Sequence, residues 1–214
     1  MPETKYYRRP IQRGKSLPGN ALLSVYDKTG LDRLAWIFSK LQVKMLGSGG
    51  TAEAVRKLGF SVLEVSEYTQ VSEMPGGLVK TLHPRIHGGI LGDWKDPDQR
   101  KYLESNGIEP LDFVVVNLYP FQEVVKADPG NLRRAVDNID IGGVALIRAA
   151  GKGALLNHRV VPITSPSQYE EVVVELERKG YVGNELRQRL AREAFVVTAD
   201  YDKAIRDYLM GQAR

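Results

Sequence analysis

Short apolar segments alternate with amphipathic segments from Ala21 onward. The apolar segments predict β-strands, and 113–116 predicts the most buried one because its apolar run does not alternate with polar residues. The expected strands are Ala21–Val25, Val43–Leu46, Val62–Val65, Phe113–Val116 and Arg159–Ile163. Such strands, alternating with helices, favour a three-layer α/β fold with a mainly parallel sheet flanked by helices.

The segments between these strands carry helix signals. Ser165 and Gln168 form a capping box with a proline in the first turn, and Gly180 marks the end of that helix. Helices are expected over 31–41, from about 51 to 58, from about 166 to 180, and over 184–210 as one helix or a pair.

Three long connections, 67–91, 117–130 and 138–158, interrupt this pattern. Connections of this length in a compact domain usually carry function. Ligands of parallel α/β sheets bind beyond the carboxyl ends of the strands, where these connections emerge. We therefore expect the functional residues there.

The composition is that of a globular protein, since 43% of the 214 residues are hydrophobic and 26% are charged. No apolar run reaches the roughly 18 residues of a membrane-spanning helix, so we expect no membrane role. The absence of cysteine excludes disulfides, a thiolate nucleophile and Cys-ligated metals.

The net charge of +4 belongs to the start of the chain, because residues 1–15 hold five basic residues and one acidic residue. Residues 1–20 are predicted to be a basic leader without regular structure, and 21–214 to be one domain. A targeting leader is less favoured, since such leaders are usually Ser-rich and amphipathic. The neutral body and the lack of a signal-peptide core predict a cytoplasmic protein with no nucleic-acid partner.

The SGGT segment at Ser48–Thr51 lies between a predicted strand and a predicted helix. Its glycines allow close backbone approach, and the helix N-terminus supplies N–H donors, so it suits a phosphate. An ordinary tight turn is an equally good interpretation of this segment alone. Lys28, in the loop after the first strand, adds a charge at the same edge of the sheet, although such a lysine is more often just solvated.

Lys80 lies among glycines and apolar residues, a setting that tunes an amine for catalysis or for anion binding. His83 and His87 have the helical spacing of metal ligands. Pro84 between them and the lack of an acidic residue from 80 to 91 make a zinc site the weaker interpretation.

Three further candidates lie in the later connections. Tyr119 precedes a proline, which favours an extended backbone that projects its phenol into the cleft, whereas an aromatic plug at the end of the sheet is the alternative. Asp140 precedes a likely helix start, where it is either functional or an N-cap. Lys152 lies in a predicted glycine-flanked turn. A carboxylate and lysines in one cleft would form a proton-transfer set, although spacing alone does not bring them together.

The ordered motifs resemble the inosine monophosphate (IMP) cyclohydrolase domain, the amino-terminal half of a bifunctional purine-biosynthesis family that also carries an AICAR transformylase. The resemblance covers about residues 21–210 and rests on the segments SVYDKTG at 24–30, SGGT at 48–51, VKTLHP at 79–84, NLYPF at 117–121, IDIGG at 139–143, RAAGK at 148–152 and AFVVTADYDKAI at 194–205. It implies a methylglyoxal-synthase-like fold and closure of formyl-AICAR to IMP with loss of water, without a cofactor or metal. No transformylase half is present, so ring closure alone is expected unless the chain is a fragment.

The resemblance also implies the site residues. The catalytic group would be Lys80, Tyr119, Asp140 and Lys152. The substrate-binding residues would be Tyr26, Asp27, Lys28, Ser48, Gly49, Gly50 and Thr51 for phosphate and ribose, and Val79, Lys80, Thr81, Val116, Asn117, Asp140 and Ile141 for the base. Departures from the family pattern are Leu78, Tyr26, Val197 and Gly153, which leave affinity less certain than reaction type.

Two alternatives share this fold: a non-catalytic nucleotide sensor and a methylglyoxal-synthase-like lyase acting on a triose phosphate. The four retained catalytic-type residues favour the cyclohydrolase over both. The resemblance further implies a homodimer, and it leaves open whether a separate enzyme formylates AICAR.

Overall fold

The structure, a computed structural model, describes residues 19–74, 77 and 79–212. Leu78 and all but the last two residues of the predicted leader lie outside this described part. The strands are β1 (Asn20–Val25), β2 (Lys44–Gly47), β3 (Leu63–Glu64), β4 (Phe113–Asn117) and β5 (Val161–Ile163). The helices are α1 (Leu31–Lys40), α2 (Gly50–Lys57), α3 (Val65–Thr69), α4 (Pro84–Leu91), α5 (Pro97–Ser105), α6 (Phe121–Ala127), α7 (Leu132–Asp137), α8 (Gly142–Leu156), α9 (Tyr169–Lys179) and α10 (Asn184–Gln212), with a 3₁₀ turn η2 (Pro166–Gln168) before α9.

The described strands form one parallel sheet in the order β3-β2-β1-β4-β5. The chain moves outward from β1 through β2 to β3, and then crosses to the other side of β1 to form β4 and β5. The strand order therefore reverses between β1 and β4, whose carboxyl ends are paired at Val25 and Asn117. In open α/β sheets, ligands bind at this reversal point.

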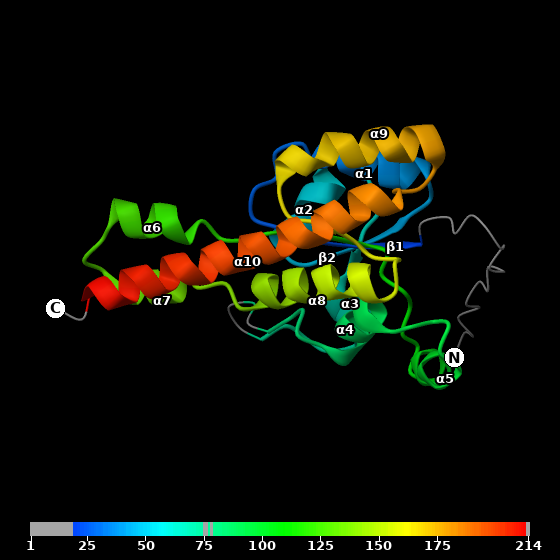
Figure 1. Cartoon of the computed structure of the whole chain (residues 1–214), viewed down its shortest axis with the longest axis horizontal. Helices are drawn as coiled ribbons and strands as arrows, with labels where there is room; N and C mark the ends of the chain where they lie inside the picture. Colours follow the sequence, from blue (N-terminus) through cyan, green and yellow to red (C-terminus); the bar gives the residue numbers. More distant parts are fainter. Residues whose placement is uncertain (1–18, 75–76, 78, 213–214) are drawn as a thin grey trace.

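Helices cover both faces of the sheet, which confirms the expected three-layer architecture (Figure 1). Successive side chains of β1 point to opposite faces, so Leu23 packs in the core formed with α1 and α9, and Leu22 in the core formed with α4 and α8. α10 contributes Leu190 to the first core and Ala191 to the second, and it packs on β5. It therefore closes that edge of the sheet.

The predicted turn around Lys152 is wrong, because 142–156 is a single helix, α8. Its glycines allow neighbouring elements to approach closely. A Cβ on Gly151 would lie 3.0 Å from the ring of Phe195 on α10, and one on Gly153 would lie 2.8 Å from the carbonyl oxygen of Ile90 on α4. Glycine that normally weakens a helix is here required by packing on two sides.

The other long connections also contain helices. α4 begins with Pro84 in its first turn, and His83 Nδ1 accepts a hydrogen bond from the Arg85 N–H at 3.1 Å. His83 is thus a helix cap. The final segment is one helix, α10, rather than a pair.

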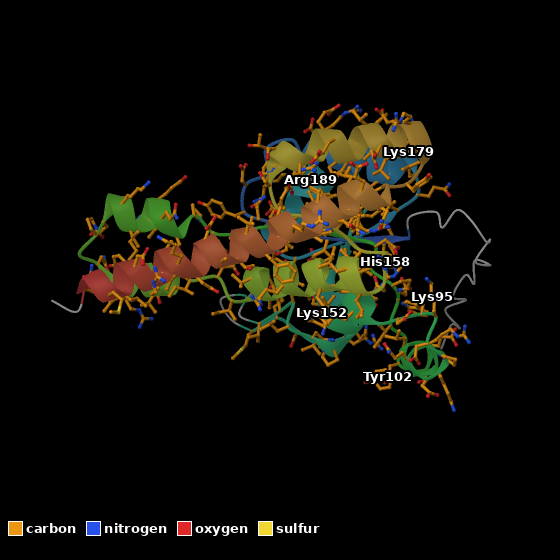
Figure 2. The ribbon with its side chains drawn as sticks, viewed as in Figure 1. Lys95, Tyr102, Lys152, His158, Lys179 and Arg189 are labelled. Atoms are coloured by element: carbon orange, nitrogen blue, oxygen red, sulfur yellow. The ribbon has the colours of Figure 1, made fainter. Side chains whose placement is uncertain are left out.

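The second half of α10 extends past the sheet and packs against α6, with α7 beside it (Figure 1). Phe121 of α6 is 1% exposed and contacts two α10 rings edge-on, Tyr201 at 6.2 Å and Tyr208 at 5.9 Å between centroids. Charged side chains are numerous on α9 and α10, and Arg189 of α10 pairs with Glu171 of α9 between the two helices (Figure 2). None of the helices in the described residues is long and apolar enough to cross a membrane.

Candidate functional site at the β1/β4 edge

Asn117, the last residue of β4, fixes the loop that follows β1. Its side-chain oxygen accepts hydrogen bonds from the N–H groups of Tyr26 at 2.7 Å and Asp27 at 2.8 Å, and its amide nitrogen donates to the Asp27 carbonyl at 2.8 Å. Asp27 in turn accepts the Thr29 N–H at 2.9 Å. The Asn117 side-chain amide therefore fixes the loop after β1 through hydrogen bonds within the chain. The neighbouring Val116 is a core residue at 1% exposure.

The SGGT segment forms the start of α2 beside this loop. Gly49 has φ 48° and ψ −124°, a conformation that L side chains rarely adopt. The buried Thr51 hydroxyl accepts from the Val25 N–H at 3.0 Å and donates to the Val25 carbonyl at 3.1 Å. Thr51 thus connects the first turn of α2 to the end of β1, so the N-terminus of α2 lies at this edge of the sheet. Ser48 is also buried.

Lys80 lies at the N-terminus of α2. A Cβ on Gly49 would lie 3.0 Å from Lys80 Nζ, and one on Gly77 would lie 3.4 Å from it. Nζ also lies 3.9 Å from a carboxylate oxygen of Glu73. The preceding residue, Val79, has φ 54°, which is unusual for a β-branched residue. The glycines thus leave room for the ammonium group next to the first turn of α2.

Lys28 lies in the loop after β1 at the same edge of the sheet. Its ammonium donates to the Tyr26 carbonyl at 3.1 Å and approaches the Val25 carbonyl at 3.4 Å. The loop after β1 therefore carries Lys28, and the connection between α3 and α4 carries Lys80.

Asp140 lies at the start of α8, where its Oδ1 accepts the Gly143 N–H at 2.6 Å. Burial raises the pKa of Asp140 above its usual value, although hydrogen bonds from the backbone of Gly143 and Tyr119 oppose this shift. The Tyr119 backbone therefore joins the end of β4 to the Asp140 carboxyl group.

Two further contacts lie at this edge of the sheet. The buried Thr81, next to Lys80, approaches the first turn of α8, since a Cβ on Gly142 would lie 3.0 Å from its hydroxyl. The rings of Tyr26 and Tyr119 meet edge-on at 5.2 Å. The structure thus brings Lys80, Tyr119 and Asp140 to one edge.

Aromatic and apolar side chains at this edge are exposed. Tyr26 and Tyr119 are 51% and 50% exposed, and Val79 and Ile141 are 57% and 63% exposed. Exposed apolar residues beside charged groups are typical of a surface that receives a ligand with a flat, partly apolar ring.

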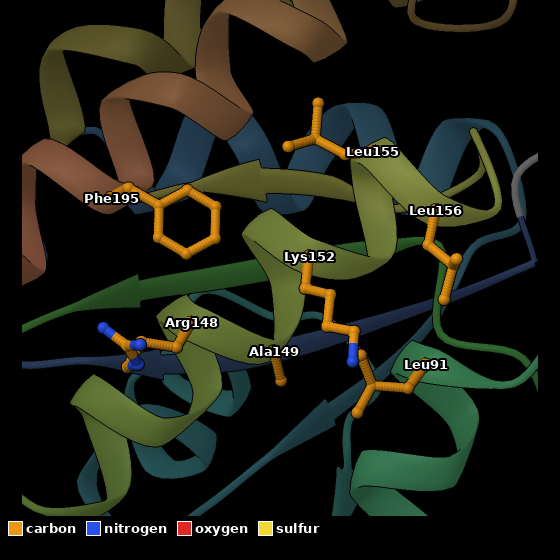
Figure 3. Close-up of a pocket in the computed structure, with 7 residues that line it drawn as sticks. All are labelled: Leu91, Arg148, Ala149, Lys152, Leu155, Leu156 and Phe195. Atoms are coloured by element: carbon orange, nitrogen blue, oxygen red, sulfur yellow. The ribbon is translucent and has the colours of Figure 1, made fainter.

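Lys152 does not join this group within the chain. It lies twelve positions after Asp140, which at the helical rise corresponds to about 18 Å. Figure 3 shows its side chain pointing toward Leu91 of α4, in an open cavity of about 560 Å³ that is also lined by Arg148 and by Phe195 of α10. Its other lining residues, Ala149, Leu155 and Leu156, are apolar.

Sequence reasoning missed Glu73, Tyr169 and Tyr201. The Tyr169 ring lies beneath the loop after β1, at 3.4 Å from a Cβ on Gly30. Burial raises its pKa to about 12, with a contribution from the negative charge of Asp27 and an opposing interaction with Asn117. Its position after the Ser165 capping box was visible in the sequence, but its direction toward the site was not.

The described residues contain no group of three His, Asp or Glu side chains able to hold a metal ion. Burial lowers the pKa of both His83 and His87, and His87 also bonds to the Thr81 backbone. Both histidines thus support the 81–91 segment.

Two family models match successive parts of the chain, and known relatives match most of it. A family model described as MGS-like domain matches residues 30–145, and one described as AICARFT/IMPCHase bienzyme matches residues 154–214. The bifunctional purine biosynthesis protein PurH of Synechocystis sp. is 48% identical over 193 residues, and that of Persephonella marina is 45% identical over 190 residues. These matches cover 89% and 88% of this chain but only 37% and 36% of the relatives. A crystal structure of ForH is similar with a TM-score of 0.77 and 29% identity, covering 90% of this chain and 99% of that chain.

Proposed function

Because the chain belongs to the MGS-like domain family and is similar to a part of PurH, we propose that it is an IMP cyclohydrolase that closes formyl-AICAR to IMP and water. The observations that support the proposal are Lys80 beside Gly49 at the N-terminus of α2 and Asp140 against the Tyr119 backbone after β4, near the reversal point of the sheet. The chain spans little more than a third of the length of the PurH relatives, so the proposal concerns ring closure alone.

The substrate's phosphate is placed at the N-terminus of α2. Gly49 and Gly50 lack side chains that would block an anion, and the helix dipole and Lys28 provide positive potential. The imidazole carboxamide is placed against the exposed Val79 and Ile141, within reach of the Asp140 carboxyl group.

Ring closure needs orientation and proton management. The carboxamide nitrogen attacks the formyl carbon of the same molecule, so holding the two groups in contact lowers the barrier. Asp140 accepts a proton from the nitrogen, for which its raised pKa is favourable. Lys80 and Tyr119 stabilise the negative charge that develops on the formyl oxygen. That oxygen takes up one proton from the carboxamide nitrogen and one from the formamide nitrogen, relayed by Asp140 and Lys152, and leaves as water.

A spectrophotometric assay with synthetic formyl-AICAR tests this function. We expect IMP from the native chain and a loss of turnover of roughly a hundredfold or more for Asp140→Asn. Binding of formyl-AICAR without conversion would instead make the chain a nucleotide sensor. Conversion of a triose phosphate to methylglyoxal would make it a lyase.

We also propose that the chain acts as a homodimer in which Lys152 serves the site of the partner copy. Within its own chain Lys152 is distant from Asp140, and the flanking Leu155 and Leu156 are 44% and 56% exposed. Exposed leucines around a cation are typical of a surface that contacts another protein.

Mixing two inactive variants tests this arrangement. Lys152→Ala and Asp140→Asn each remove one group, and a mixed dimer keeps one complete site. We expect each variant alone to be impaired and the unfolded and co-refolded mixture to regain about a quarter of native turnover. Full activity of Lys152→Ala, or a monomer by sedimentation, would contradict the proposal.

We further propose that a separate transformylase supplies the formylated substrate, since the PurH relatives are bifunctional. The chain with AICAR and a formyl-folate donor should produce no IMP until a transformylase is added. Production of IMP without it would contradict this division of activities.

A further inference from the structure

Tyr201 of α10 holds the backbone on either side of Ile139. Its hydroxyl accepts a hydrogen bond from the Asp140 N–H at 2.8 Å and donates one to the Asn138 carbonyl at 3.2 Å. One phenol therefore satisfies two backbone groups in the short link between α7 and α8. That link ends in the proposed catalytic carboxylate.

The Tyr201 ring is itself fixed by packing. It is half-buried and meets Phe121 edge-on at an interplanar angle of 64°. Phe121 begins α6, directly after the NLYP segment that carries Tyr119. The same aromatic contact thus connects α10 with the segment that follows β4.

Tyr201 leaves the Asp140 carboxyl group available. The Asp140 N–H donates its hydrogen bond to Tyr201, whereas the Asp140 carboxyl oxygen accepts one from the Gly143 N–H at 2.6 Å and faces the Tyr119 backbone. Burial, with the charges of Asp140 and Asp202, raises the pKa of Tyr201, while its hydrogen bond to the Asp140 backbone opposes this. The hydroxyl therefore stays protonated at neutral pH and keeps its donor role.

We propose that Tyr201 is a positioning residue for ring closure, which sets the orientation of Asp140 by clamping residues 138–140 to α10. This inference rests on the proposed function. Tyr201 has no direct contact with substrate in this scheme, so its effect acts on kcat through Asp140. A displacement of about 1 Å of a reacting group costs up to a hundredfold in rate.

Tyr208 provides a matched control on the same helix. It also contacts Phe121 edge-on, at 84°, and its hydroxyl donates to the Pro129 carbonyl at 3.1 Å. Both tyrosines therefore combine a ring on Phe121 with a hydroxyl on a loop carbonyl. Only Tyr201 bonds to the Asp140 backbone.

The experiment compares Tyr201→Phe with Tyr208→Phe, because each removes one oxygen and keeps the ring. We expect Tyr201→Phe to lower kcat for formyl-AICAR roughly tenfold or more, to leave KM within about twofold, and to shift the acid limb of the pH profile. Tyr208→Phe should keep kcat and the pH profile. Thermal unfolding should show both variants folded.

Amide hydrogen exchange gives a readout independent of turnover. Exchange at the Asp140 amide should accelerate in Tyr201→Phe and stay unchanged in Tyr208→Phe. Unchanged kcat and pH profile in Tyr201→Phe, or equal losses in both variants, would overturn the positioning role. A native chain that does not convert formyl-AICAR would overturn the proposed function, and the exchange data would then show whether the clamp itself exists.

Discussion

Two lysines that lie near glycines in the sequence, Lys80 and Lys152, occupy different surroundings in the structure. Around Lys80, Gly49 and Gly77 have positive φ values and leave space for the ammonium group. Around Lys152, Gly151 and Gly153 are helical and leave space for neighbouring helices. Glycine next to a charged residue therefore indicates close approach, but it does not say whether a ligand or another part of the fold approaches.

The largest expected effect concerns the Lys80 region. Lys80→Ala removes the positive charge beside the start of α2, so turnover of formyl-AICAR should fall roughly a hundredfold or more. Lys28→Ala, which keeps Lys80, should mainly raise KM because it removes only a phosphate contact. Steady-state kinetics separates the two, and near-native kcat in Lys80→Ala would remove this residue from the catalytic group.

The next effect concerns pH and Asp140. Burial raises the pKa of Asp140, so its carboxylate becomes protonated at a higher pH than that of an exposed aspartate. As the solution is acidified, activity that needs this carboxylate should therefore fall at a correspondingly higher pH. A kcat profile measures this limb. An acid limb at the pH of an ordinary aspartate would show that Asp140 is not the proton acceptor.

The same shift predicts a stability change. A raised folded-state pKa stabilises the fold at low pH, and this contribution is lost as the pH rises through that pKa. Near neutral pH the carboxylate therefore opposes folding, and Asp140→Asn should match or exceed the native stability while losing turnover. Urea unfolding tests this; a clear destabilisation near neutral pH would contradict it.

A smaller effect on activity is expected for a change at Gly153, next to Lys152. Gly153→Ala places a Cβ 2.8 Å from the Ile90 carbonyl oxygen and should destabilise the fold by about 1–3 kcal/mol. Its kcat should stay near native while the protein is folded. Gly211→Ala on α10, where no atom lies within 4 Å of the new Cβ, is the control and should not destabilise. Equal unfolding midpoints for the two variants would show that α8 does not need Gly153.

The smallest effect concerns metal removal. Among the described residues no three candidate ligands are grouped, and the Nδ1 atom of His83 accepts a backbone N–H. Prolonged treatment with a chelator should leave turnover unchanged. A loss restored by added zinc would show a metal site that the described side chains do not reveal.

The sheet was predictable because its strands are short apolar runs between clear stop signals. The helices of the long connections were harder. α8 is buried on more than one side, because Ala149 and Gly151 are buried as well as Leu146 and Ile147, so its sequence does not give a narrow one-face period. α5 had a readable signal in Asp96 followed by Pro97, since Asp96 accepts N–H bonds from the first turn.

The site was predictable as a set of residues but not as a set of contacts. The end of β4 indicated that Tyr119 lies at the carboxyl edge of the sheet, where ligands bind. Asp140 follows α7 rather than a strand, so the sequence did not indicate that it lies near Tyr119. The approach of Lys80 to Gly49 depends on the path of 71–83, for which the sequence has no periodic signal. The link between Asp140 and Tyr201 joins residues 61 positions apart, so no local pattern reports it.

α10 also makes the chain sensitive to changes in length. Phe195 faces Gly151, Tyr201 bonds to Asp140, and Tyr208 bonds to Pro129, all from one continuous helix. Inserting a single residue after Phe195 would rotate everything beyond it by about 100° and advance it by about 1.5 Å. Both tyrosine hydroxyls would then miss their partners at once. Insertions and deletions should therefore be tolerated in the surface loops but not between Phe195 and Tyr208.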